Sequence, residues 1–151
     1  MWSFHTAMTG KLDPEEVKEI TSRIFDGTRA IIKKYEGFIE RFAGDGILAL
    51  FGVPKTHEDD PIRAIRAALE IHRFVESLNP LYQNKVGRTL TMHSGINTGL
   101  AVTADVNPGK GTHGVTGEAV NLGARLSELA DAGDILVGEE TYRASRERFT
   151  F

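Results

Sequence analysis

FIERFAGDGILALF (residues 38–51) decides the fold, because two apolar runs flank a short glycine-containing turn. Residues 38–42 and 47–51 are rich in aromatic and branched side chains, which favour strands. The AGDG segment between them is typical of a tight hairpin loop, in which an Asp-Gly pair is a common turn dipeptide. The segment therefore predicts a β-hairpin with one carboxylate, that of Asp45, at its tip.

Helical patterns lie on both sides of this hairpin. Asp-Pro pairs start two helices, because Asp caps the first turn and proline is preset for it. Apolar residues then recur at helical spacing and predict helices over residues 14–34 and 60–78. The remaining predicted elements are strands over 88–97, 100–104 and 134–137 and helices over 118–130 and 139–145. The first two of these strands are expected to form a second hairpin-like pair.

The order of these elements favours an α+β fold. Helices interleave with antiparallel strand pairs, as in a ferredoxin-like split βαβ sandwich with a mixed, mainly antiparallel sheet covered by helices. That plan normally opens with a strand, but no clean strand can be read in residues 1–11, so the first strand is expected to be truncated. A chain of 151 residues fits one domain, which we expect to span residues 1–151.

Composition excludes several classes of protein. The chain has no cysteine, which excludes disulfides, thiolate nucleophiles and Cys-ligated metal sites, and its five histidines lack zinc-ligand spacing, which makes a zinc site a poor fit. A net charge of -3 gives no sign of a nucleic-acid partner or an anionic membrane. No apolar run approaches the roughly 18 residues of a membrane span, and no secretory signal is seen. We therefore expect a cytoplasmic protein that binds neither nucleic acid nor membrane.

A second segment, GEAVNLGARL (residues 117–126), carries polar groups that complement Asp45. Asn121 and Arg125 are four residues apart and share one face of the predicted helix. An amide can orient a ribose and a guanidinium can stabilise phosphate charge, so the pair suits chemistry on a phosphate ester. The alternatives are a solvated helix face, with Glu118 or Glu128 as the partner of Arg125, and a plain turn role for Asp45.

Five collinear motifs resemble the catalytic domain of class III nucleotide cyclases. They are TAMTGKLDPEEV, GDGILALFG, HEDDPIRAIRAAL, GINTG and GEAVNLGARL, in that order between about Ser3 and Thr150. The resemblance implies conversion of ATP or GTP to a 3′,5′-cyclic nucleotide and pyrophosphate, for intracellular signalling. It also implies Mg²⁺ or Mn²⁺, two ions per site, which activate the ribose 3′-hydroxyl for attack on the α-phosphate.

The resemblance also assigns roles to residues. Asp45 matches a metal-binding carboxylate. Asn121 and Arg125 match a catalytic pair that acts across a homodimer interface and completes the partner's site. The remaining matches are positions that contact substrate in the family: Thr6, Arg41, Gly44 and Gly114.

Several positions depart from the family's pattern. Met1 stands where the first metal-binding Asp is expected, and Phe4 replaces a glycine whose main chain approaches phosphate. Gly114 has no side chain with which to select a base. Arg41 keeps a donor, although an exposed cross-strand role beside Glu40 is an equal alternative to base contact. The choice between adenine and guanine is left open.

Two hypotheses follow. The first is a homodimeric, metal-dependent cyclase, with the domain incomplete at both ends because the family pattern extends beyond residues 1–151. With its first metal carboxylate missing, this chain is then expected to show little or no turnover. The second is a catalytically impaired, cyclase-like module that dimerises or senses nucleotides.

Overall fold

The computed structural model of the protein describes residues 2–5, 14–43, 46–53, 55–86, 90–99, 102–103, 115–116 and 118–151. Its elements are β1 (Trp2–His5), α1 (Pro14–Lys34), β2 (Phe38–Ala43), β3 (Gly46–Leu50), α2 (Asp60–Ser77), α3 (Asn79–Val86), β4 (Thr91–Ile96), β5 (Val102–Thr103), β6 (Val115–Thr116), α4 (Glu118–Leu129), β7 (Ile135–Val137) and α5 (Glu139–Ser145). Within these ranges, no helix is both long and apolar enough to cross a membrane.

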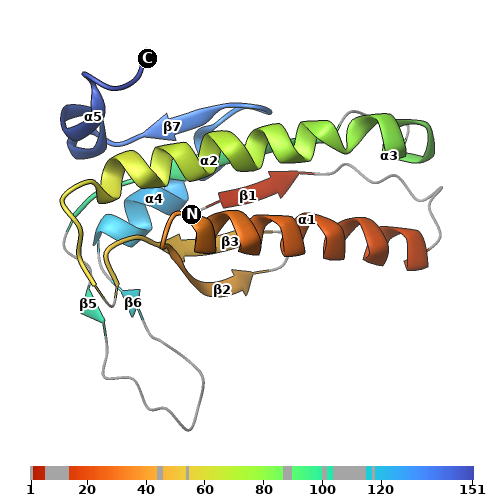
Figure 1. The fold of residues 1–151 in the computed structure, drawn as a ribbon, viewed down its shortest axis with the longest axis horizontal. Coiled ribbons are helices and arrows are strands. Elements are labelled where there is room, and N and C mark those ends of the chain that lie inside the picture. The colour runs from red at the N-terminus through yellow and green to blue at the C-terminus, as the bar shows by residue number, and fades with distance from the viewer. Residues whose placement is uncertain are drawn as a thin grey trace, which may run out of the picture.

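The main sheet has five strands in the order β2-β3-β1-β4-β7. Every neighbouring pair is antiparallel except β4 and β7, which are parallel. Helices α1 and α2 lie side by side over one face of this sheet (Figure 1). The arrangement confirms the predicted α+β class, with a mixed, mainly antiparallel sheet covered by helices. The predicted hairpin, the first two long helices and the C-terminal strand and helix are confirmed as well.

A strand is present near the N-terminus, where none could be read from the sequence. β1 is four residues long and lies in the centre of the sheet, antiparallel to β3 on one side and to β4 on the other. The WSFH segment is too short to show a strand pattern of its own. Its conformation follows from main-chain pairing with two strands that are distant in the sequence, and such pairing leaves no local signal.

The predicted pairing of residues 88–97 with 100–104 is wrong. β4 lies between β1, which pairs with Thr91–Ser94, and β7, which pairs with Ser94–Ile96. β5 pairs instead with β6 in a separate two-stranded sheet. Closeness in sequence favoured a hairpin, but the parallel partner β7, which pairs from Ser94↔Ile135 onward, takes the edge that such a hairpin would need.

The hydrophobic core lies between the sheet and the helices α1 and α2. Its members include Ile20, Ile24 and Ile32 of α1, Ile65, Ile71 and Val75 of α2, and Ile47 and Met92 of the sheet. One polar pair is buried in this core. The imidazole of His72 on α2 lies 2.7 Å from the hydroxyl of Ser94 on β4. Burial disfavours the charged imidazolium and lowers the pKa of His72 to about 4.

An ion-pair cluster ties the end of α1 to the start of α2. Glu36 follows α1 in the left-handed conformation (φ 60°), within the main-chain bonds of a Schellman motif. The buried Arg63 of α2 donates to the Glu36 carboxylate at 2.8 Å and to the Tyr35 carbonyl at 3.2 Å. Arg63 also donates to Asp60 at 2.6 Å, so this corner of the fold is held by one guanidinium.

Candidate functional site

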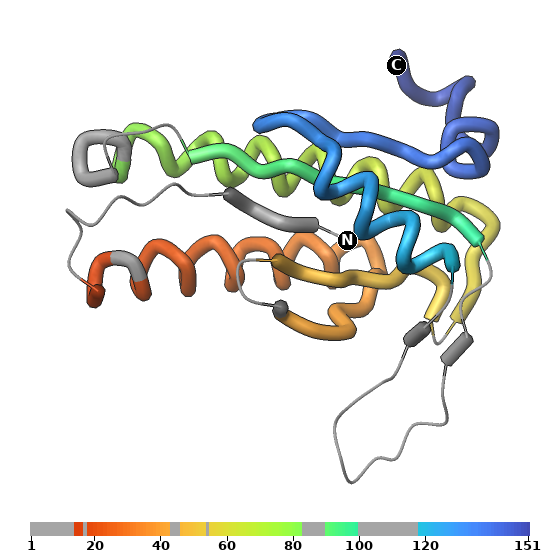
Figure 2. Tube along the Cα trace, turned by 180° about the vertical axis from the view of Figure 1, so that it is seen from behind, coloured from red at the N-terminus to blue at the C-terminus, as the bar shows by residue number. Residues whose placement is uncertain are grey.

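Helix α4 carries both predicted catalytic residues and lies directly on β4. Seen from behind, α4 crosses in front of β4, on the face of the sheet opposite α1 and α2 (Figure 2). Strand residues alternate between faces, so the residue before and the residue after Ser94 face α4 while Ser94 faces α2. These are His93 and Gly95, and both contact α4.

The contact between β4 and α4 is made through the main chain of the helix. His93 Nδ1 lies 2.6 Å from the Ser127 carbonyl oxygen, and Asn97 Nδ2 donates to the Ala119 carbonyl at 3.0 Å. Between them, a Cβ added to Gly95 would come within 2.2 Å of the Ser127 amide nitrogen. The side of α4 that faces β4 therefore consists of small residues at i, i+4 and i+8 spacing: Ala119, Gly123 and Ser127.

Asn121 and Arg125 lie on the other side of α4. Each is two positions from Gly123, which corresponds to about 200° around a helix of 3.6 residues per turn. Both are exposed, whereas Gly123 is buried. No ion pair joins Arg125 to Glu118 or Glu128, all of which the structure describes, so the alternative in which one of these carboxylates pairs with Arg125 is not formed. The amide and the guanidinium are thus presented outward, one turn apart.

A bulge in the hairpin determines where Arg41 points. Ile39 pairs with Ala49 and Arg41 pairs with Leu48, which leaves Glu40 as an extra residue on β2. An extra residue reverses the alternation of faces beyond it. Arg41 is therefore placed on the face opposite the core, where regular alternation from Ile39 would have placed it toward α1.

Contacts of the neighbouring side chains agree with this reversal. Phe42 packs against Phe25 of α1, with ring centroids 4.9 Å apart, and Arg29 lies over the Phe42 ring at 5.3 Å. Arg41 lies on the other face of the sheet, beside its register partner Leu48, and is exposed. Its Nε lies 3.3 Å from the carboxylate of Glu40, whose side chain is 5% exposed against 56% for Arg41.

Four predicted positions lie outside the described residues. They are the metal ligand Asp45 and the substrate positions Thr6, Gly44 and Gly114. The strands on either side of the turn are described, and their pairing extends to Ala43↔Gly46. Within the described ranges, no group of three or more His, Asp or Glu side chains could hold a metal ion.

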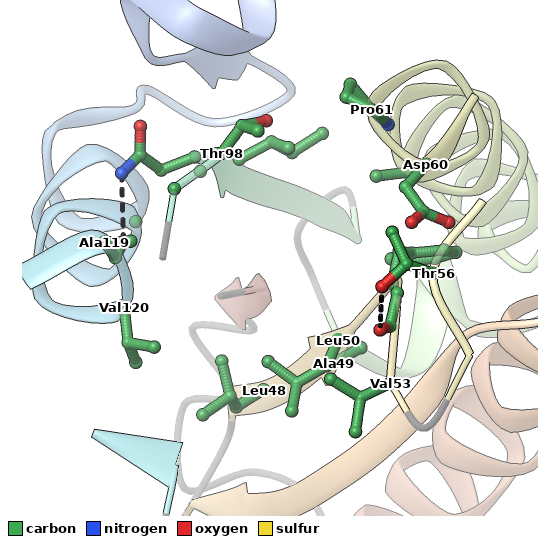
Figure 3. A pocket seen from close by; sticks show the side chains of 18 of the residues that line it. Leu48, Ala49, Leu50, Val53, Thr56, Asp60, Pro61, Thr98, Ala119 and Val120 are labelled. Atoms are coloured by element: carbon green, nitrogen blue, oxygen red, sulfur yellow. Dashed lines mark hydrogen bonds between the residues drawn. The ribbon is translucent and has the colours of Figure 1, made fainter. Parts of the chain in front are cut away.

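A pocket of about 470 Å³ lies at the end of the sheet where β3 and β4 continue past Trp2 (Figure 3). Its labelled walls are Leu48, Ala49 and Leu50 of β3, Val53 and Thr56 of the following loop, Asp60 and Pro61 of α2, Thr98, and Ala119 and Val120 of α4. Arg41, Asn121 and Arg125 do not line it. Ala119 and Gly123 of α4 line this pocket, whereas Asn121 and Arg125 lie on the exposed side of the helix.

Comparison with known proteins identifies the family. The model of the adenylate and guanylate cyclase catalytic domain matches residues 3–151. The chain therefore belongs to this family, the class III nucleotide cyclases.

Relatives and solved structures agree with this assignment. The chain is similar to the crystal structure of the guanylyl cyclase Cya2, with 31% identity and a TM-score of 0.85 over 95% of this chain and 75% of that chain. The adenylyl cyclase CyaB from P. aeruginosa has the same fold, with 23% identity and a TM-score of 0.90 over 99% of this chain and 79% of that one. Adenylate cyclase 1 of Rhizobium meliloti (strain 1021) is 28% identical over 130 residues, 85% of this chain and 19% of its own length. The chain spans only 13% and 19% of the first two curated relatives.

Sequence reasoning assigned no role to the anchors of α4. Gly95 and Asn97 belong to the GINTG motif, which served only to identify the family. The available signal was the alternation of His93, Gly95 and Asn97 at strand spacing, opposite small residues at helix spacing.

Proposed function

We propose that the protein is a nucleotide cyclase domain that converts ATP or GTP to a 3′,5′-cyclic nucleotide and pyrophosphate for intracellular signalling. The observation that carries the proposal is the outward presentation of Asn121 and Arg125 by a helix fixed to the central sheet. The Asn121 amide would orient the ribose, and the Arg125 guanidinium would stabilise negative charge that develops on the phosphates.

The proposed site is shared between two copies of the chain. Asn121 and Arg125 face away from the sheet to which α4 is bound and do not line the pocket behind α4. Groups so placed can act on a nucleotide held by a second domain. In this homodimer each copy would contribute its α4 surface to the site of its partner.

Arg41 would contact the base. Its Nε lies 3.3 Å from the Glu40 carboxylate, and no described residue bonds the two terminal nitrogens, which are the donors left for a ligand. Arginine has no acceptor, so these donors suit O6 and N7 of guanine, whereas the amino group of adenine would need an acceptor from elsewhere. Activity with both nucleotides, measured for the parent and for Arg41→Ala, tests this role. Equal effects on ATP and GTP would contradict it.

Divalent metal is used by the family in general, and the ion proposed here is Mg²⁺ or Mn²⁺. Asp45 is the proposed ligand, while the described residues provide no donor set for a pair of ions. Met1 stands at the position of the other carboxylate. We therefore expect little or no turnover with ATP or GTP under Mn²⁺. A rate near 10 per second, typical of enzymes, would contradict this expectation.

Mixing variants tests the shared site. Asp45→Ala and Asn121→Ala remove groups from the two sides of one site, so a mixture should form one intact pair of surfaces and exceed either variant alone. Asn121→Ala mixed with Arg125→Ala is the matched control, because both changes affect the same surface and neither can restore the other. Equal activities in the two mixtures would exclude a site shared between chains.

The second candidate function is a cyclase-like module that dimerises or senses nucleotides. Met1 and Phe4, at positions where the family pattern has an Asp and a glycine, favour it. Nucleotide binding measured by calorimetry, with no cyclic product formed under Mn²⁺, would support this candidate over the enzyme.

A further inference from the structure

Helix α4 is fixed near its two ends, at one end by β4 and at the other by the loop that follows β4. His93 contacts the Ser127 carbonyl and Asn97 contacts the Ala119 carbonyl, so the strand and the helix run in opposite directions along their contact. A carbonyl oxygen only accepts, so His93 Nδ1 must carry the proton in this bond. Two side chains thus donate to main-chain oxygens two helical turns apart.

The middle of the contact permits little sliding. A Cβ on Gly95 would lie 2.2 Å from the Ser127 nitrogen and 2.4 Å from the Gly123 oxygen, both main-chain atoms. At such an approach, a shift of α4 along or away from β4 changes both hydrogen bonds together. The main-chain contacts therefore fix both the distance of α4 from the sheet and its position along its own axis.

Two neighbouring residues in the loop after β4 contact different helices, α4 and α5. Asn97 reaches α4, whereas the next residue, Thr98, lies 2.7 Å from the hydroxyl of Thr141 on α5. Two neighbouring side chains therefore hold two different helices. This difference provides a matched control within one loop.

We propose that Asn97 and His93 are positioning residues that fix the axial position of α4 and thereby place Asn121 and Arg125. The expected effect on catalysis rests on the proposed function, whereas the fixed position of α4 does not. Neither residue needs to touch substrate. Both act through helix carbonyls whose displacement moves the outward face of α4 by the same amount, and misplacement by about 1 Å can cost on the order of a hundredfold in rate.

The test compares Asn97→Asp, which keeps the shape but replaces the donor by a negatively charged acceptor, with Thr98→Val, which breaks the bond to α5 only. His93→Leu removes the second donor, and His93→Asn restores an N–H at a similar distance. The first readout is amide hydrogen exchange along α4, measured on folded protein whose thermal unfolding midpoint is also determined.

We expect exchange in α4 to become roughly five- to tenfold faster in Asn97→Asp and His93→Leu, since one hydrogen bond contributes about that factor. Thr98→Val should leave α4 unchanged, and His93→Asn should restore protection toward the parent. Unchanged exchange in α4 of Asn97→Asp would overturn the inference, whether or not the protein has activity.

The second readout is the division of the effect between kcat and KM. A displaced Asn121–Arg125 pair should lower kcat roughly tenfold to a hundredfold while KM changes less than about threefold. An equal fall for Thr98→Val would indicate general loosening and would overturn the positioning role. A parent without turnover would favour the cyclase-like module over the enzyme, and the exchange measurement would still decide whether α4 is fixed as described.

Discussion

Replacing Gly95 by alanine tests the close packing of α4 on β4. The added Cβ would meet the Ser127 nitrogen at 2.2 Å and the Gly123 oxygen at 2.4 Å, each about an ångström or more inside the 3.4 Å at which ordinary contact begins. Both atoms are main chain, so no side-chain rotation relieves the overlap. The helix must lift away from the strand, or β4 must bend.

The expected cost is large for a single methyl group. Overpacking costs about 1–3 kcal/mol, and main-chain obstacles favour the upper end of that range. Lifting α4 also weakens the hydrogen bonds from His93 and Asn97, at about 1 kcal/mol each. The free energy of unfolding should therefore fall by about 3–5 kcal/mol, which for a domain of this size lowers Tm by roughly 6–20 °C.

Gly27→Ala is the matched control. A Cβ at Gly27 would also meet its nearest atom at 2.2 Å, but that atom is at the far end of the Phe74 ring, which can turn aside. Alanine also favours the helix by up to about 1 kcal/mol, so the net change should stay within about 1.5 kcal/mol. Urea unfolding of both variants decides the matter. If Gly95→Ala costs no more than Gly27→Ala, the described approach of α4 to β4 is wrong.

Two further predictions concern the core and its edge. The pKa of His72 is lowered to about 4 from an ordinary 6.5. Between pH 4 and pH 6.5, His72 therefore binds a proton in the unfolded chain but stays neutral in the native state. The stabilising contribution of neutral His72 is thus complete above pH 6.5 and is lost as the pH falls toward 4, so the free energy of unfolding should drop by about 2 kcal/mol at pH 5. Urea unfolding at pH 7 and pH 5 should show a smaller drop for His72→Gln. An unchanged drop would contradict His72 as its cause. Arg63→Ala should cost about 2–4 kcal/mol, because it leaves the largely buried Asp60 without its guanidinium. The exposed Arg143→Ala should cost less than about 0.5 kcal/mol, and similar losses for the two variants would contradict the difference in burial.

Much of the fold is predictable because its signals are local. The Asp-Pro start and helical spacing defined α2, observed over Asp60–Ser77, and glycine-flanked apolar runs defined the β2–β3 hairpin. The short helix α3 was not predicted, because proline at position 80 favours the end of a helix near residue 78. Proline is tolerated in the first turn of a helix, so the Asn79-Pro80 dipeptide both ends α2 and begins α3.

The parts that could not be predicted depend on partners distant in the sequence. β1 is a strand because β3 and β4 pair with it on both sides. The bulge at Glu40 becomes visible only when the register with β3 is known. Single-sequence patterns contain neither relation, so the sequence identified Arg41 as a candidate without indicating which face of the sheet it would occupy.

The two sides of α4 explain why its candidate residues were easier to predict than their support. Asn121 and Arg125 stand out because polar groups at helical spacing suit phosphate chemistry. The side that determines their position has no such signature: Ala119, Gly123 and Ser127 are small residues that read as ordinary helix. Their importance follows from how closely the main chain on this side approaches Gly95, where an added Cβ would come within 2.2 Å of the Ser127 nitrogen. We therefore expect substitutions on the plain side of α4 to affect the outward pair as strongly as substitutions beside it.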